Sequence, residues 1–169
     1  KLLRVRLFGF GQFNHGLNVT FAPDRLNLVV GRNEAGKSTL LNAISGVLFG
    51  FRDLNLVRKY EPWAEHDSYS GEVEFALDDG RRIRVWRDFH AATARITQFD
   101  HDEETILFDG SADPRGRADD DQRYFEALQA LVGIADESLF RNTVFVGQMG
   151  LRTEVSDQIR RLVSGSGTV

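Results

Sequence analysis

The sequence predicts an α/β fold in which a buried strand leads through a glycine-rich loop into a helix, with an antiparallel β meander behind it. An apolar run at 26–30 precedes a loop that contains Gly31 and Gly36, and a helical apolar pattern starts directly after that loop. Residues 72–108 alternate apolar and polar positions in several short stretches, which is typical of half-buried strands. We therefore expect parallel nucleotide-binding strands together with an antiparallel sheet.

The glycine-rich loop matches the phosphate-binding pattern G-x-x-x-x-G-K-[ST] (Walker A) at every fixed position. Its glycines let the backbone wrap closely around phosphates, and the helix that follows adds about half a positive charge at its N-terminus. We expect ATP and Mg²⁺, with Lys37 on the β and γ phosphates, the Ser38 hydroxyl on Mg²⁺ and Thr39 near the α phosphate. The expected binding residues are Gly31, Arg32, Asn33, Glu34, Ala35, Gly36, Lys37, Ser38 and Thr39.

The composition of the 169-residue chain excludes several classes of protein. There is no cysteine, which removes disulfide scaffolds, thiolate zinc sites and cysteine nucleophiles. The net charge of -4 gives no overall basic field that would indicate nucleic acid. No apolar run is long enough to span a bilayer, and the N-terminus is interrupted by charge too early for a signal peptide. We expect no membrane association and a cytoplasmic protein.

Two antiparallel strands are predicted before the nucleotide strand, at 3–8 and 17–21, with a break at 9–11 between them. The helix after the loop is expected to end at Gly50, a plausible C′ residue. Residues 51–69 carry charge and little periodicity, and we interpret them as an ordered excursion over the surface.

The next stretch predicts a hairpin of strands 72–77 and 82–87 around an Asp-Gly turn. Strands at 94–99 and 105–108 extend the meander, and residues 109–121 read as a mobile loop. The acidic run 119–121 and the stretch 100–104 could hold a metal ion, but a solvated loop is the favoured interpretation of both.

A helix is predicted from Gln122 to a stop at Gly133, and Asp136 is expected to cap a short helix through Phe140. An apolar strand at 143–146 then leads to Gln148, which is either a polar cap on a turn or a functional glutamine. The last apolar helical face, at 155–163, ends in a Ser-Gly stretch that resembles a flexible linker.

Hydrolysis requires a second acidic residue on Mg²⁺, and the chain offers only one weak candidate. Asp78 follows a short apolar run, but Glu74 interrupts that run and Asp78 falls in the hairpin turn. No lysine follows an asparagine, so the guanine-reading Asn-Lys-x-Asp sequence is absent and a GTPase is not expected.

Taken together, the sequence resembles the N-terminal half of the ATP-binding heads of SMC-like ABC-class ATPases. The residues that carry the resemblance are the loop and helix start at 32–44, Leu48-Phe49-Gly50, Gly9-Phe10-Gly11-Gln12-Phe13, the hairpin at 71–88 and the stretch 140–148. The likeness is strongest to the SbcC and YhaN type, relatives of the RecF and RecN repair ATPases and of the Rad-fifty proteins. The separation of Lys37 and Gln148 fits repair-type heads better than transporter ATPases.

This resemblance implies a division of the chain and a set of roles. Gln148 would be the Q-loop glutamine, which contacts Mg²⁺ or the attacking water, so Lys37 and Gln148 would be the catalytic residues and Ser38 and Gln148 the metal ligands. The whole of 1–169 would be half a head: 1–50 the first strands, P-loop and helix, 51–121 the excursion and meander, 122–150 the helices and Q-loop strand, and 151–169 a helix toward a coiled coil or linker.

The resemblance also implies partners. A separate C-terminal half would bring the signature motif, an Asp-Glu strand and a switch histidine, and two heads would form a homodimer around ATP. DNA and an SbcD-like nuclease are expected partners in double-strand-break repair, recombination or chromosome maintenance, in a nucleoid-associated protein. Without its C-terminal half the fragment is expected to be nearly inactive as an ATPase.

Two other functions stay open on the sequence: a non-catalytic ATP-dependent clamp or scaffold, and an autonomous small P-loop NTPase that uses Asp78. DNA contacts are expected among the strand arginines, and the resemblance implies that a basic residue of the excursion (Arg52, Arg58 or Lys59) lies near the nucleotide or DNA. The alternative is that the strand arginines form only a solvated face. The strand arginines concerned are Arg4, Arg6, Arg81, Arg82, Arg84 and Arg87.

Overall fold

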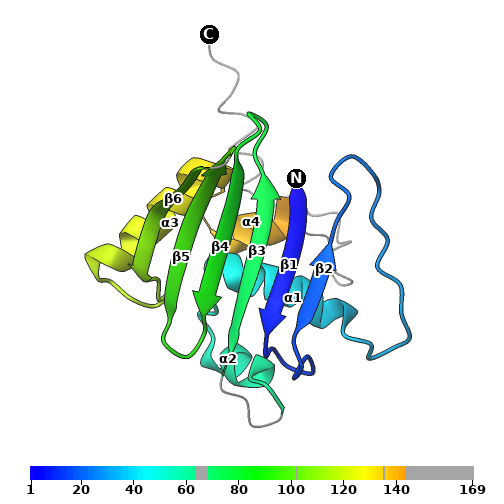
Figure 1. Cartoon of the computed structure of the whole chain (residues 1–169). Helices are drawn as coiled ribbons and strands as arrows, with labels where there is room; N and C mark the ends of the chain where they lie inside the picture. Colours follow the sequence, from blue (N-terminus) through cyan, green and yellow to red (C-terminus); the bar gives the residue numbers. More distant parts are fainter. Residues whose placement is uncertain (64–67, 102, 135, 144–169) are drawn as a thin grey trace.

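The computed structural model describes residues 1–63, 68–101, 103–134 and 136–143. These residues form one antiparallel sheet of six strands in the order β2-β1-β3-β4-β5-β6, with helices beside it (Figure 1). The strands are β1 (Leu2–Phe8), β2 (Leu17–Thr20), β3 (Ser70–Ala76), β4 (Arg82–Asp88), β5 (Thr93–Asp100) and β6 (Glu103–Ser111). The helices are α1 (Lys37–Phe49), α2 (Leu54–Tyr60), α3 (Asp119–Val132) and α4 (Glu137–Thr143).

The predicted hairpin and meander are confirmed. β3 pairs with β4 around a turn in which Gly80 has a φ of 93°, and the Leu77 backbone N–H donates to the Arg81 carbonyl at 2.9 Å. β4 pairs with β5 and β5 with β6, each antiparallel. The alternation of apolar and polar residues was sufficient here because each strand has its partner close by in the chain.

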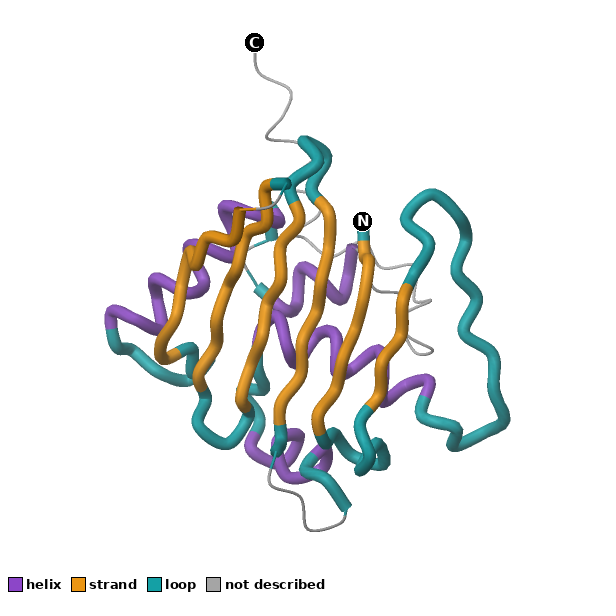
Figure 2. Tube along the Cα trace, viewed as in Figure 1, coloured by secondary structure: helices purple, strands orange, loops and turns teal. Residues whose placement is uncertain are grey.

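The core lies between this sheet and α1, which contacts β3 and β4 (Figure 2). Val73 and Val85 are almost fully buried on the inner face of the central strands, and Val47 of α1 is fully buried against them. A Cβ atom at Gly71 would lie 2.7 Å from Val47 Cγ2, so the small residue lets helix and sheet approach closely. α3 contacts β6, and α4 contacts α1.

A cluster of aromatic rings fixes the loop that follows β1. The Phe10 ring lies 5.1 Å from the Tyr60 ring and 5.3 Å from the Phe89 ring, between centroids. Phe51 stacks on Tyr60 at 5.5 Å. Such ring pairs contribute about 0.5–1.5 kcal/mol beyond their buried area. The cluster therefore holds the loop after β1 against the end of α2.

The excursion at 51–69 contains a helix that the sequence pattern did not predict. The Asp53 carboxylate accepts from the Asn55 backbone N–H at 2.8 Å, which is a regular N-cap for α2. The signal was present, but the helix is only seven residues long and its apolar residues show too little periodicity to reveal it.

The two later helices agree with the prediction, except that α3 starts earlier and α4 ends three residues later than expected. α3 begins at Asp119, three residues before Gln122, and ends at Gly133 in the left-handed conformation. The Asp136 carboxylate accepts from the Leu139 backbone N–H at 2.8 Å and caps α4 as expected. Thr143 belongs to α4, whereas the rest of the predicted strand, Gln148 and the final helix lie outside the described residues.

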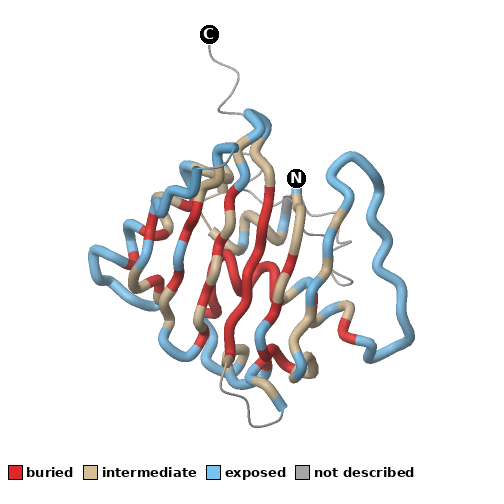
Figure 3. The backbone as a smooth tube through the Cα atoms, viewed as in Figure 1, coloured by how far each residue is buried: buried red, intermediate tan, exposed pale blue. Residues whose placement is uncertain are grey.

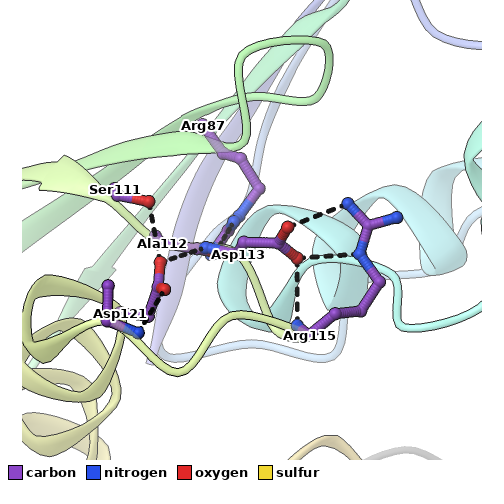
Figure 4. Close-up of polar contacts among 7 residues, drawn as sticks. Arg87, Ser111, Ala112, Asp113, Arg115 and Asp121 are labelled. Carbon is purple, nitrogen blue, oxygen red and sulfur yellow. Dashed lines mark hydrogen bonds and ion pairs between the residues drawn. The ribbon is translucent and has the colours of Figure 1, made fainter.

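The acidic run 119–121 forms the first turn of α3 rather than a solvated loop. Asp121 is 4% exposed and accepts from the Ser111 hydroxyl at 2.7 Å and from the Asp113 backbone N–H at 2.9 Å (Figure 4). It also accepts from the Ala118 backbone N–H at 3.2 Å. Negative charge in the first turn stabilises a helix, so this aspartate has a structural role.

Arg87 corrects one expectation, because the sequence placed it among the arginines expected to contact DNA. It is 1% exposed and donates to the Val47 carbonyl at 2.9 Å. It also donates to the Ala112 carbonyl at 2.7 Å (Figure 4). The odd-numbered residues of β4 face α1, and Arg87 follows that alternation. Its guanidinium therefore bonds a carbonyl of the last turn of α1.

The prediction of a strand at 26–30 was wrong, and the expected parallel strands are not confirmed. The structure assigns no strand to this segment, and Leu26 is 93% exposed while Leu28 and Val30 are each 77% exposed. A strand needs a neighbour to satisfy its backbone groups, and the described residues provide none beside this segment.

Candidate nucleotide-binding site

The phosphate loop turns into α1 at Gly36, whose φ of 87° and ψ of 9° are left-handed. A Cβ atom there would lie 2.5 Å from both Phe13 Cζ and Gln12 Nε2, so a larger residue has neither the conformation nor the space. Glu34 also has a positive φ, of 64°, which is uncommon for a residue with a side chain. Such conformations concentrate at functional sites.

Lys37 folds back over this loop. Its ammonium donates to the carbonyls of Gly31 and Arg32, each at 2.6 Å. The positive charge therefore lies in the concave side of the loop, where the phosphates of a nucleotide are expected. In this arrangement the loop carbonyls take the place of phosphate oxygens as acceptors for Lys37.

The loop forms one wall of a cavity of about 640 Å³, a size that suits a nucleotide. Six of the predicted binding residues line this cavity. Gln12 and Trp63 also line it, although the sequence did not predict them as binding residues. The lining residues are Gln12, Asn33, Glu34, Gly36, Lys37, Ser38, Thr39 and Trp63. Gly31, Arg32 and Ala35 form the adjoining part of the loop without lining this cavity.

Trp63 is held by its backbone while its ring stays available. The Trp63 N–H donates to the Gly11 carbonyl at 3.2 Å and to Asn14 Oδ1 at 3.0 Å, yet the residue is 73% exposed. A large exposed aromatic residue at the mouth of a phosphate-loop cavity is suited to stack on a base. The sequence gives no sign that a single tryptophan beside Pro62 binds a ligand. Its exposure at the cavity identifies it as a candidate binding residue.

The loop after β1 reaches the site because Gly11 packs against the start of α1. A Cβ atom at Gly11 would lie 3.3 Å from Thr39 Cγ2, and the Gly11 N–H donates to the Tyr60 carbonyl at 2.7 Å. The loop after β1, the phosphate loop and the end of α2 are thus joined at one end of the sheet.

The predicted metal site is only partly described. Ser38 lines the cavity, but Gln148 lies outside the described residues. Within the described ranges no three histidine, aspartate or glutamate side chains gather where they could hold a metal ion. Among the described residues, the Ser38 hydroxyl is therefore the candidate ligand for Mg²⁺.

Asp78, the weak candidate for a second acidic ligand, lies far from this cavity. It follows the end of β3, and that end pairs with the start of β1, whereas the cavity lies beyond the last residue of β1. Seven residues of strand separate the two ends, a span of about 20 Å. An autonomous NTPase that uses Asp78 on Mg²⁺ is not compatible with this geometry.

The outer face of the sheet is not covered by any helix of the described chain (Figure 2), and most of its arginines are paired. Arg6 Nε donates to Glu72 at 2.7 Å, and Arg84 lies 3.4 Å from the same carboxylate. Arg95 pairs with Asp109 at 2.7 Å. Arg4 donates to the neutral Asn18, and Arg82 lies over the Phe99 ring at 5.5 Å.

The left-handed glycine before α1, the lysine over the loop and the adjoining cavity define a P-loop nucleotide-binding protein. A family model described as "AAA domain" matches residues 4–159, and the chain belongs to that family. Within the described residues, no helix is long and apolar enough to cross a membrane.

Two curated relatives are similar to most of the chain. Both are described as "DNA double-strand break repair Rad50 ATPase": one from Methanopyrus kandleri is 35% identical over 126 residues, and one from Thermoplasma acidophilum is 30% identical over 109 residues. The matches cover 73% and 64% of this chain but only 13% and 11% of those proteins. The resemblance to the N-terminal half of an SMC/Rad50-like ATPase is confirmed.

Proposed function

We propose that this chain is the ATP-binding half of an SMC/Rad50-like head that acts in double-strand-break repair, recombination or chromosome maintenance. The observation that carries the proposal is the cavity that joins the phosphate loop to Gln12 and Trp63. The relatives are described as repair ATPases, which supports ATP as the nucleotide and DNA repair as the process.

Each part of the cavity has a role in binding. The N–H groups of the loop and Lys37 would hold the phosphates, once Lys37 exchanges the Gly31 and Arg32 carbonyls for phosphate oxygens. The Ser38 hydroxyl, with Gln148, would hold Mg²⁺. Trp63 would stack on the base, and the Gln12 amide offers both a donor and an acceptor to the base or ribose.

A C-terminal half is the first partner we propose. The segment 26–30 exposes its leucines and valines, and Leu41 of α1 is 40% exposed. Beside Leu41 lies an apolar hollow of about 360 Å³ whose lining includes Ile44 and Phe140. Exposed apolar residues and an apolar hollow are features of an interaction surface. In this proposal, parallel strands of the C-terminal half cover α1 and pair with residues 26–30.

The assembled head is proposed to hydrolyse ATP, and the isolated chain to turn it over at close to the background rate. Within the described residues no three acidic or histidine side chains gather into a metal site, and in this proposal the C-terminal half supplies the acidic Mg²⁺ ligand together with the signature motif. Adding that half should restore turnover. Two such heads would form a homodimer around ATP, and this cytoplasmic, nucleoid-associated assembly would act on DNA with an SbcD-like nuclease.

For DNA contacts we propose Arg4 and Arg82 on the outer face of the sheet. Neither forms an ion pair in the described structure, whereas Arg6, Arg84 and Arg95 are neutralised by carboxylates. The alternative of a purely solvated face fits those three arginines well.

The nucleotide site is tested by titrating MgATP into the wild-type chain and into Lys37→Ala by calorimetry. Lys37→Ala should lose binding and keep its free energy of unfolding, because its half-buried side chain contributes charge to the ligand and is not part of the core. Lys1→Ala is the matched control, since Lys1 pairs with Asp24 away from the cavity. Equal affinities for wild type and Lys37→Ala would overturn the proposal.

A further inference from the structure

A polar link joins α1 to α4 one turn beyond the phosphate loop. Asn42 Nδ2 donates to the Ser38 carbonyl at 2.7 Å, and Asn42 Oδ1 accepts from Arg141 Nη2 at 3.1 Å. A guanidinium can only donate, so the Asn42 amide has one orientation that satisfies both neighbours. Asn42 thus connects the backbone of Ser38, in the first turn of α1, to the last turn of α4.

A second contact fixes the same two helices. Glu137 Oε1 accepts from Arg141 Nε at 2.7 Å and from the Ser45 hydroxyl at 3.1 Å, and Ser45 is fully buried. Asn42 faces Arg141 while Ser45 faces Glu137, so α1 and α4 run antiparallel here. Arg141 therefore donates from Nε to its own helix and from Nη2 to α1.

The two ends of this link are positions that matter to the nucleotide site. Ser38 is the described candidate ligand for Mg²⁺, and its backbone carbonyl is the acceptor for Asn42. Arg141 precedes Gln148, the expected Q-loop glutamine, by seven residues of sequence. Two hydrogen bonds therefore connect Ser38, the candidate Mg²⁺ ligand at the start of α1, to α4.

We propose that Asn42 and Arg141 are positioning residues that couple the loading of the phosphate loop to the orientation of α4. The inference rests on the proposed function, because it assigns a task to residues of that ATPase site. A hydrogen bond weakens steeply with distance and angle, so a small shift of Ser38 is enough to make or break the bond from Arg141 to Asn42. Such a link biases one arrangement of α4 in the loaded state.

The inference predicts a selective effect on turnover in the complete protein that contains this chain. Arg141→Met and Asn42→Ala should each lower kcat about fivefold to tenfold, the effect of removing one or two hydrogen bonds. The KM for MgATP and the affinity for nucleotide should stay within about twofold of wild type, because neither side chain lines the cavity. The double variant should be no slower than the slower single variant, since both break one link.

Three further variants separate positioning from simple helix packing. Asn42→Asp keeps an acceptor for Arg141 but cannot donate to Ser38, so it should be as slow as Asn42→Ala while retaining the thermal stability of wild type. Arg141→Lys can still donate to Asn42 and should recover part of kcat. Arg123→Met is the control, because Arg123 lies on α3, where its guanidinium pairs with the exposed Asp120.

The decisive measurement is kcat and KM for the wild type and all these variants, together with their melting temperatures. Reduced kcat at constant KM, with no further reduction in the double variant, supports the link. Wild-type kcat in Asn42→Asp and Arg141→Met, or a rise in KM in step with reduced thermal stability, would overturn it. A wild-type protein that neither binds nor hydrolyses MgATP would instead overturn the proposed function, and this inference with it.

Discussion

Two regions of this chain are both predicted as strands and have opposite structural outcomes. The alternating pattern of β3 and β4 places Val73 and Val85 in the core, whereas in the apolar run 26–30 Leu28 and Val30 are each 77% exposed (Figure 3). β3 has β1 and β4 as neighbours, and α1 covers its inner face. The segment 26–30 has no strand beside it in the described chain.

The difference teaches that an apolar run specifies a strand only where the chain also supplies its partner. Backbone groups of a strand must be paired, and its side chains need a second layer to bury them. The antiparallel sheet with α1 has both within one chain. We interpret the segment 26–30 as an element whose partner belongs to the proposed C-terminal half.

The same kind of substitution in the two regions gives the largest expected contrast. Val85→Asp places an unpaired carboxylate in the core and should cost more than about 4 kcal/mol, enough to unfold the chain. Leu28→Asp should change the free energy of unfolding by less than about 0.5 kcal/mol, because the side chain is already in water. Urea denaturation measures both, and a large destabilisation in Leu28→Asp would show that the segment is already packed.

Arg87 tests how the buried region is held together. Arg87→Ala removes two hydrogen bonds to buried carbonyls and the stacking on the Tyr124 ring, and should cost about 3 kcal/mol. Arg82→Ala on the same strand is the matched control and should cost less than about 0.5 kcal/mol, because Arg82 is exposed. The comparison is made by urea denaturation, and equal costs would contradict a structural role for Arg87.

The nucleotide site lies between the two regions, because the phosphate loop connects segment 26–30 to α1. Trp63 tests this site. Trp63→Ala should raise the Kd for MgATP about tenfold, the effect expected for one aromatic ring stacked on a base. Trp63→Phe should keep part of the affinity. Both variants should melt like wild type, because Trp63 is mostly exposed. An unchanged Kd in Trp63→Ala would remove Trp63 from the site.

The smallest effect is expected for DNA binding by the outer face of the six-stranded sheet. In an ATP-bound complete head, Arg4→Glu with Arg82→Glu should weaken binding to all DNA sequences alike. It should also flatten the log-log salt dependence by about 0.9 for each phosphate that is no longer neutralised. Arg95→Glu is the comparison variant and should change the slope less, because Arg95 is already neutralised by the exposed Asp109. An unchanged slope in the first pair would direct the search to Arg58 and Lys59.

The sequence predicted those parts of the fold that local pattern decides. The Asp-Gly turn, the caps at Asp136 and Gly133 and the phosphate loop all depend on residues within a few positions of one another. Arg87 could not be assigned, because whether a strand arginine faces solvent or core depends on which face α1 covers. Trp63 could not be assigned either, because its place at the cavity depends on bonds to Gly11 and Asn14 about fifty residues earlier.

The central claim is that residues 26–30 lack a partner in the described chain and gain one in the assembled head. Amide hydrogen exchange tests it directly, in the isolated chain and in the chain with its C-terminal half and MgATP. We predict that the amides of 26–30 exchange fast in the isolated chain and are protected in the complex, while those of β3 and β4 are protected in both. Protection of 26–30 in the isolated chain, or fast exchange there in a complex that hydrolyses ATP, would contradict the claim.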